Sequence, residues 1–209
     1  MIEPHNLILF FISSLLLALA PGPDNLFVLA QSAQNGRKTG LTVTLGLCTG
    51  LLIHTSAVAL GVAAIFRASA LAFNLLKYIG AAYLLYLAWQ AFHAKQTAIT
   101  LSGNPAAGFG RLYRRGIIMN VTNPKVSIFF LAYLPQFTAA EKGALILQMF
   151  MLGFVFILAT ILVFGSISLV AGAVGEYLRR STRIQKILDW LAGTIFTGLA
   201  IKLAITERS

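Results

Sequence analysis

The sequence predicts an all-α integral membrane protein, with six transmembrane helices arranged as two inverted three-helix repeats in which helices 1 and 4 are broken. Three observations predict this fold class. The chain is 58% hydrophobic and 11% charged, whereas soluble domains carry about 25% charged residues. Its basic residues fall mainly in short gaps between apolar segments, and prolines interrupt two of those segments. We expect residues 1–209 to form one membrane domain, with repeat halves at about residues 1–100 and 106–209.

Six apolar segments remain when the gaps that contain Lys or Arg are removed. Each has about 19 residues or more, which at 1.5 Å per residue crosses a hydrocarbon core of about 30 Å. The longest polar stretch, at residues 94–115, separates the third segment from the fourth and is the predicted linker between the halves. The six segments are Leu7–Ala33, Thr42–Phe66, Leu71–Phe92, Gly116–Leu134, Leu145–Ala173 and Ile187–Ile205.

Prolines divide the first and fourth segments. The first is longer than a single span requires, and Ala-Pro-Gly-Pro-Asp-Asn interrupts it at residues 20–25. The fourth carries Asn-Pro-Lys at residues 123–125. Proline removes a helical hydrogen bond and leaves a carbonyl free to face a polar group. We therefore expect a half-helix, a break and a second half-helix in the first segment, and a matching break in the fourth.

A stripe of small residues follows one face of the second segment, and His54 lies on the same face. The stripe consists of Gly46, Gly50, Ala57 and Gly61. Small residues let membrane helices approach closely, so we expect this face, with His54, to point into the bundle. Two interpretations of His54 stay open. It is either a histidine bonded to a neighbouring hydroxyl or carbonyl, or a proton relay, because imidazole titrates near neutrality.

The two halves resemble each other at a constant spacing. An offset of 103 residues pairs Pro21 with Pro124, and the same offset pairs Gly50 with Gly153. Three spans in each half would make the copies insert with opposite topology, which is the architecture of secondary transporters with a substrate site near the midplane. At this offset Lys125 lies opposite Gly22, so the charges of Asp24 and Lys125 are neighbours and not symmetry mates. Gly40 and Gly143 pair likewise, and an offset of 113 pairs Gly80 with Gly193 and Tyr83 with Phe196.

Basic residues are distributed unevenly between the two sides of the membrane. Ten lie on one side and five on the other. Cytoplasmic loops carry the excess of Lys and Arg, so we expect the first side to be cytoplasmic and both termini to be periplasmic. The ten are Arg37, Lys38, Lys95, Arg111, Arg114, Arg115, Arg179, Arg180, Arg183 and Lys186, and the five are Arg67, Lys77, Lys142, Lys202 and Arg208.

Asp24 and Lys125 are the strongest candidate site residues, because each follows a proline inside a segment expected to lie in lipid. Charges at bilayer depth are costly, usually face a cavity and mark a transport pathway. The pair is expected to hold a zwitterion or to exchange protons, and a structural ion pair is the alternative. An α-amino acid fits, since a half-helix N-terminus attracts a carboxylate and Asp24 can receive an ammonium. The predicted substrate-binding and translocation residues are Pro21, Gly22, Pro23, Asp24, Asn25, Asn120, Asn123, Pro124 and Lys125.

Other classes of protein lack support in the sequence. There is no Gly-x-x-x-x-Gly-Lys-Ser/Thr phosphate loop, so ATP-driven transport by this chain is not expected. The histidines are scattered and form no cluster with carboxylates, and convergent nucleophile and base residues are absent. We therefore expect no enzyme activity, no cofactor and no metal site. The net charge of +10 is better explained by loop charges that set topology than by a nucleic-acid interface.

Several motifs together resemble the LysE/RhtB family of amino-acid exporters. They are Ala-Pro-Gly-Pro-Asp-Asn-Leu at residues 20–26, Gly-Arg-Lys with a further glycine at 36–40, Gly-Ala-Ala-Tyr-Leu at 80–84, Asn-Pro-Lys at 123–125 and Leu-Pro-Gln-Phe at 134–137. The resemblance runs nearly end to end. It implies an inner-membrane efflux protein for amino acids or close derivatives, energised by the proton gradient or by exchange. We predict that such an exporter works by alternating access around the two breaks.

Two alternatives stand beside amino-acid export. One is an ion or metal exporter of the wider superfamily, which the absence of clustered His or carboxylates disfavours. The other is a membrane subunit that transports nothing. The expected partners are an amino-acid substrate, protons as the coupling ion and the lipid bilayer, and a homo-oligomer is compatible with the sequence.

Overall fold

A computed structural model describes residues 2–68, 70–94, 108–139, 143–180 and 182–205 of the chain. Those residues form helices joined by short turns and contain no strand. The helices are α1 (Pro4–Leu19), α2 (Pro23–Asn35), α3 (Arg37–Ala68), α4 (Ala70–Phe92), α5 (Phe109–Val121), α6 (Pro124–Ile128), α7 (Leu145–Arg180) and α8 (Thr182–Ile205). Most of the predicted linker, with Lys95, and also Lys142 and Arg208 lie outside the described residues.

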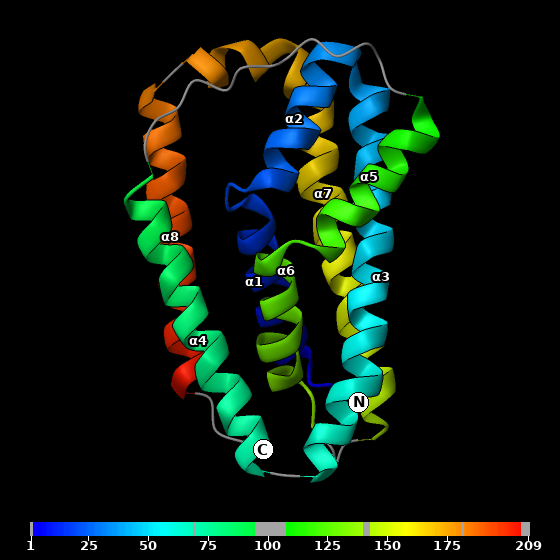
Figure 1. The fold of residues 1–209 in the computed structure, drawn as a ribbon, viewed down its shortest axis with the longest axis vertical. Helices are drawn as coiled ribbons and strands as arrows, with labels where there is room; N and C mark the ends of the chain where they lie inside the picture. Colours follow the sequence, from blue (N-terminus) through cyan, green and yellow to red (C-terminus); the bar gives the residue numbers. More distant parts are fainter. Residues whose placement is uncertain (1, 69, 95–107, 140–142, 181, 206–209) are drawn as a thin grey trace.

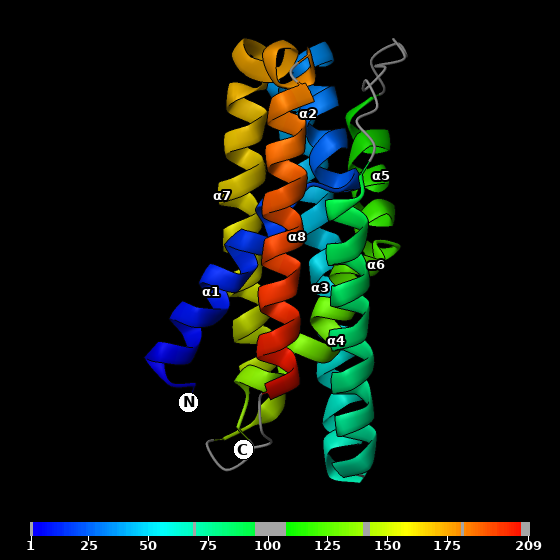
Figure 2. The ribbon, with the colours of Figure 1, turned by 90° about the vertical axis from the view of Figure 1, so that its left-hand side faces the viewer.

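The predicted breaks are present and strongly bent. The axes of α1 and α2 differ by 62°, and the axis of α5 differs by 51° from that of the segment Pro124–Phe137. The second segment is irregular beyond α6, because Phe129–Tyr133 form a π-helix and Leu134–Phe137 form a 3-10 helix. Figure 2 shows α1 leaning away from the bundle below its junction with α2.

The described residues contain three helical stretches that are long and apolar enough to cross a membrane: Arg37–Gly61, Leu145–Ala171 and Lys186–Ile205. The number rises to five if each bent pair counts as one span. The predicted third span, Leu71–Phe92, is helical as α4 but is not among these candidates. A multi-pass helical protein is therefore confirmed, while six spans in two inverted repeats stay a prediction.

The helices form two groups, with α1, α2 and α6 between them (Figure 1). On one side α3 packs against α5 and α7, and on the other α4 packs along α8. Helices α1 and α2 both pack against α7. The turn between α2 and α3, the start of α5, the end of α7 and the start of α8 lie at one end of the molecule, while the start of α1 and the end of α8 lie toward the other. We call these the upper and lower ends.

An aromatic cluster fills the core below the breaks. Phe10 of α1 packs against Phe129 and Phe137, with ring centroids 5.7 and 5.2 Å apart. Phe156 of α7 lies 5.3 Å from Phe129 and 5.2 Å from Phe130. Since these rings come from α1, α7 and the irregular segment after α6, they hold both broken segments against α7.

The small-residue stripe of α3 is an interface over only half of its length. A Cβ atom on Gly50 would lie 2.7 Å from Cβ of Asn120 in α5, and a Cβ on Gly46 would come still closer to the backbone carbonyl oxygen of Tyr113 in α5. Ala57 and Gly61 are exposed, and no atom of the described residues lies within 4 Å of a Cβ on Gly61. The expectation that the whole face points inward was therefore wrong, because α5 ends at Val121 and leaves the rest of the stripe uncovered.

Candidate functional site

The local sequence explains why both breaks form where they do. Pro23 and Pro124 are the first residues of α2 and α6, where a missing N–H costs nothing and the fixed φ suits a helix. Gly22 precedes α2 in an extended conformation, with φ −174° and ψ 177°. Helix α1 has already ended at Leu19, so its last carbonyl groups lack the helical N–H donors that would follow.

Lys125 supplies donors to the carbonyl groups at the first break. Its Nζ atom donates hydrogen bonds to the carbonyl oxygens of Leu17 at 3.2 Å and of Ala20 at 2.9 Å. Its side chain is 8% exposed. A Cβ atom at position 22 would lie 3.3 Å from the same Nζ atom, which explains the glycine there. The second break thus completes the hydrogen bonding of the first.

Asp24 lies in the first turn of α2 with a 3% exposed side chain. A helix N-terminus favours negative charge. Its Oδ2 atom accepts a hydrogen bond from Nδ2 of Asn123 at 2.9 Å, while its Oδ1 atom has no hydrogen-bond partner among the described residues. Asn123 also caps α6, because its Oδ1 atom accepts the backbone N–H of Lys125 at 3.1 Å. Asn123 therefore links the two charged residues without direct contact between them.

The alternative of a structural ion pair is not what the structure shows. Within the part of the chain that is described, Asp24 and Lys125 form no ion pair, since Lys125 bonds to backbone carbonyls and Asp24 bonds to Asn123. The carboxylate lies near enough to Lys125 and His54 to interact electrostatically with both. The aspartate and the lysine are therefore close to each other but not paired.

Two further asparagines have unsatisfied oxygens next to the breaks. Asn25 donates from Nδ2 to the carbonyl oxygen of Ala18 at 2.6 Å, and Asn120, 2% exposed, lies beside Asp24. In the described residues, the Oδ1 atoms of Asn25 and Asn120 are buried without a partner, as is that of Asp24. Most buried polar atoms in proteins are hydrogen-bonded, and each exception requires an explanation. Three unpaired acceptors beside the breaks would match a ligand that brings donors.

The nine predicted site residues divide into two sets. The structure buries Asp24, Asn25, Asn120, Asn123 and Lys125 and brings them together. Pro21 and Gly22 are half-buried, and Pro23 and Pro124 are exposed. The prolines therefore shape the breaks from outside the polar group.

His54 lies at the edge of this polar group. It is half-buried, and its Nε2 atom is 3.1 Å from the carbonyl oxygen of Asn120. Its ring packs against Phe130 with centroids 5.6 Å apart. One of the two interpretations of His54, a bond to a neighbouring carbonyl, is thus present, and a role in proton relay stays a prediction.

A cavity of about 360 Å³ adjoins the first break. It lies between the α1–α2 junction, α7 and α8, and Asn25 belongs both to its wall and to the polar group. Sequence reasoning missed it, because its wall combines residues more than 140 positions apart whose only shared signal is apolar character. The remaining lining residues are Leu19, Pro21, Leu26, Leu29, Ser166, Ile167, Val170, Ala171 and Leu188.

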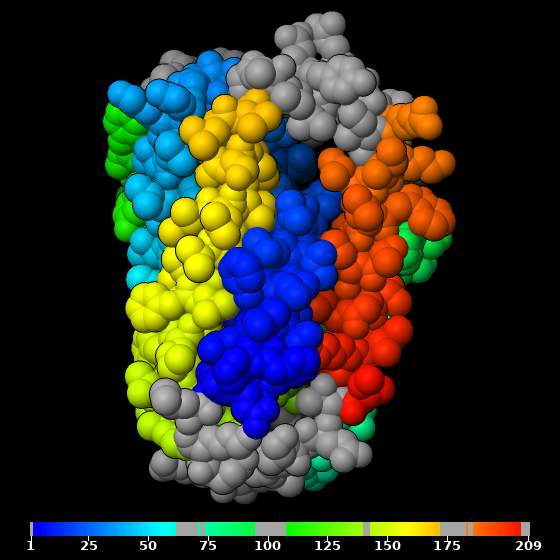
Figure 3. Space-filling model, turned by 180° about the vertical axis from the view of Figure 1, so that it is seen from behind, coloured from blue at the N-terminus to red at the C-terminus, as the bar shows by residue number. Residues whose placement is uncertain are grey.

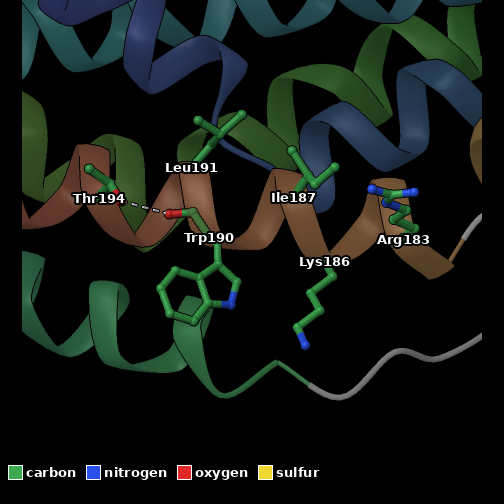
Figure 4. Close-up of a pocket in the computed structure, with 6 residues that line it drawn as sticks. All are labelled: Arg183, Lys186, Ile187, Trp190, Leu191 and Thr194. Carbon is green, nitrogen blue, oxygen red and sulfur yellow. Dashed lines mark hydrogen bonds between the residues drawn. The ribbon is translucent and has the colours of Figure 1, made fainter.

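A second cavity, of about 400 Å³, lies along the first turns of α8. All six residues that line it come from that helix (Figure 4), including Arg183, Lys186 and Trp190. The hydroxyl of Thr194 donates to the carbonyl oxygen of Trp190 at 2.9 Å, so it is already satisfied. None of these residues belongs to a break, and the cavity adds nothing to the predicted site.

The bundle and its two facing breaks define a multi-pass α-helical membrane protein with a buried polar group at the junctions. Comparison with known families is decisive about its class. The LysE type translocator family matches residues 15–207, and the chain belongs to this family, as the sequence motifs predicted. It is accordingly a transporter and not an enzyme.

Individual relatives extend along nearly the whole chain. The leucine efflux proteins of Salmonella typhimurium (strain LT2) and Salmonella choleraesuis (strain SC-B67) are each 31% identical over 95% of this chain and 94% of their own length. A protein of Vibrio cholerae, described as an uncharacterized membrane protein, is 29% identical over 97% of this chain and 98% of its own. No solved structure matches the chain significantly.

Proposed function

We propose that this protein is an inner-membrane secondary transporter that exports an amino acid, with leucine and similar residues as the first substrates to test. Membership of the LysE family supports transport, and the relatives named leucine efflux proteins support an amino acid as the cargo. In this proposal the side of the membrane with ten basic residues is the cytoplasmic side, because cytoplasmic loops carry the excess of Lys and Arg.

The observation that carries the proposal is the set of unpaired buried acceptors beside a buried lysine. Oδ1 atoms of Asp24, Asn25 and Asn120 have no donor in the described structure, and the α-ammonium of an amino acid brings three N–H donors. The ammonium of Lys125 offers its charge to the α-carboxylate, because two backbone carbonyls neutralise it only in part. A zwitterion would thereby satisfy both sides of the polar group.

The packing above and below the polar group supports a proposal of alternating access. The aromatic cluster of Phe10, Phe129, Phe130, Phe137 and Phe156 packs the core below the polar group. The cavity that Asn25 lines adjoins the polar group at the α1–α2 junction and lies against α7 and α8. We propose that the substrate enters near this cavity and leaves once the aromatic cluster separates, with the proton gradient or exchange as the driving force. His54 and Asp24 are the proposed proton carriers.

The test is export from cells that are loaded with leucine-containing dipeptides and then release free leucine. We expect cells that express the protein to release leucine faster than cells without it. The variants Lys125→Ala and Pro21→Ala should lose most of this difference, since the first removes the charge and the second relaxes the break. Lys38→Ala is the matched control, because Lys38 is exposed at the start of α3.

Two results would contradict the proposal. Export at the wild-type rate by Lys125→Ala and Pro21→Ala, at equal membrane levels, would remove the breaks from the transport pathway. No flux of any amino acid from vesicles that contain the purified protein would favour an ion exporter or a subunit that does not transport.

A further inference from the structure

We infer that the cavity beside the first break is the subsite for the aliphatic side chain of the exported amino acid. This inference rests on the proposed function and deepens it, because it assigns a place and a chemical class to the part of the substrate that distinguishes one amino acid from another. The polar group at the breaks would hold only the atoms that all α-amino acids share.

The wall of the cavity is almost entirely apolar. Four helices contribute to it: Leu19 from α1, Leu26 and Leu29 from α2, Ile167 and Ala171 from α7, and Leu188 from α8. The hydroxyl of Ser166 donates to the carbonyl oxygen of Leu162 at 2.6 Å and is satisfied within its own helix. Apart from Asn25, which the inference assigns to the head group, the remaining wall is a poor environment for a charged or amide side chain, whereas it removes a branched alkyl group from water.

The size of the cavity suits a small ligand. At about 360 Å³ it falls at the lower end of the range of about 300–1,000 Å³ for ligand pockets in proteins. Figure 3 shows this face of the molecule, where α1 lies between α7 and α8 and the surface is hollowed at the level of α2. The cavity is therefore open on one side, as an entry route requires.

Asn25 joins the cavity to the polar group. The same residue lines the cavity, donates to the carbonyl oxygen of Ala18 and keeps a buried Oδ1 atom without a partner in the described residues. Asp24 is its chain neighbour, and a Cβ on Gly22 would lie 3.9 Å from Oδ1 of Asn25 and 3.3 Å from Nζ of Lys125. An amino acid with its α-carbon beside Asn25 would place its head group in the polar group and its side chain in the cavity.

The experiment narrows the cavity and then widens it, and it measures the ratio of leucine to alanine export. Ala171 is 2% exposed, so Ala171→Leu fills the cavity and should lower this ratio at least about tenfold, since one methylene in an apolar pocket changes specificity roughly 10–200-fold. Leu29→Ala should instead raise export of phenylalanine relative to leucine. Leu169→Phe is the control, because Leu169 lies on the same helix, is 61% exposed and does not line the cavity.

A labelling experiment remains informative even if Ala171→Leu does not fold. Cys48 is the chain's single cysteine, so Cys48→Ala with Ser166→Cys leaves one thiol, placed in the cavity wall. Saturating leucine should slow reaction of this thiol with a maleimide, and glycine should not, because glycine has no side chain to occupy the cavity. A fatty acid that slows labelling while leucine has no effect would show that lipid fills the cavity and would overturn the inference.

Failure of the inference and failure of the proposed function look different. If the wild-type protein exports leucine, and the cavity variants keep its ratio of leucine to alanine export, the side-chain subsite is refuted and export stands. If the wild-type protein exports no amino acid, the proposed function itself is refuted.

Discussion

Among single residues, Asn123 has the widest set of tasks in the polar group. Its carbonyl oxygen Oδ1 caps α6 by accepting the N–H of Lys125, and its Nδ2 atom donates to Asp24. The sequence predicted Asn123 only as one of the substrate-binding and translocation residues beside a break. The sequence did not predict that Lys125 bonds to backbone carbonyls at the end of α1. Which carbonyls the side chain reaches depends on the angle of the break.

We expect Asn123→Ala to lower the free energy of unfolding by about 2–4 kcal/mol. A lost helix cap costs about 1 kcal/mol, and a buried charged group left without its donor costs about 1–3 kcal/mol or more. Unfolding by denaturant in detergent micelles measures the change. Thr122→Ala is the control, because the Thr122 hydroxyl is exposed and bonds only within its own helix. Equal stabilities of the two variants would contradict this account of Asn123.

Between elements, the clearest relation is the contact of α3 with α5. The glycines of α3 let α5 approach so closely that Asn120 lies against Gly50. The spacing of small residues predicted that this face of α3 points into the bundle, but it did not identify α5 as the partner, and it extended the buried face along the whole stripe. Helix α5 ends at Val121 because the break begins there. The small residues of α3 beyond that point therefore have no part of α5 packed against them. The spacing of small residues predicts which face of a helix forms an interface, whereas the length of that interface depends on the length of the neighbouring helix.

Gly50→Ala and Gly61→Ala should have opposite effects on stability. A Cβ on residue 50 would lie 2.7 Å from both Cβ and Oδ1 of Asn120, and overpacking of this kind typically costs about 1–3 kcal/mol. Residue 61 has open space around it, so alanine there gains up to about 1 kcal/mol of helix propensity. Thermal unfolding of the two purified variants tests the difference, and a stabilised Gly50→Ala variant would rule out the close approach.

The irregular segment after α6 is an element that sequence reasoning did not foresee. A continuous apolar run extends from Ile128 to Leu134, and a hydropathy pattern does not distinguish an α-helix from a π-helix. The structure places a π-helix at Phe129–Tyr133 and a 3-10 helix at Leu134–Phe137. Such segments often mark functional positions in helices. Here the segment carries three rings of the aromatic cluster, from Phe129, Phe130 and Phe137, and also Tyr133, whose ring packs against two of them.

For the whole molecule, the proline breaks and the membrane class were predictable, and the internal symmetry is not yet established. The paired glycines Gly50 and Gly153 both lie at close contacts, but Gly50 meets Asn120 of α5 while Gly153 meets Thr55 of α3. At the offset of 103 residues those partners are not equivalent. An inverted repeat requires related helices to occupy related positions in space, and glycine spacing along one chain does not contain that information.

The orientation of the molecule in the membrane can be tested directly. The upper end carries the turn between α2 and α3 and the start of α5, where five of the ten basic residues on the predicted cytoplasmic side lie: Arg37, Lys38, Arg111, Arg114 and Arg115. We expect alkaline phosphatase, which is active only in the periplasm, to be active when fused after residue 209 and inactive when fused within residues 95–107. The reverse pattern would invert the proposed direction of entry, and activity at both positions would contradict the predicted topology.

The bonds from Lys125 to Leu17 and Ala20 also bear on how the protein is made. The donor follows its acceptors by 108 and 105 residues in the chain, so a ribosome completes the first broken helix long before its partner exists. Unsatisfied carbonyls cost several kcal/mol each in hydrocarbon. Until the fourth segment is inserted, contact with water or with other protein is therefore the more favourable environment for the break in the nascent N-terminal half. The bonds from Lys125 to the first break therefore form late in membrane insertion. We expect a truncated first half to be less stably inserted in the bilayer than the full chain.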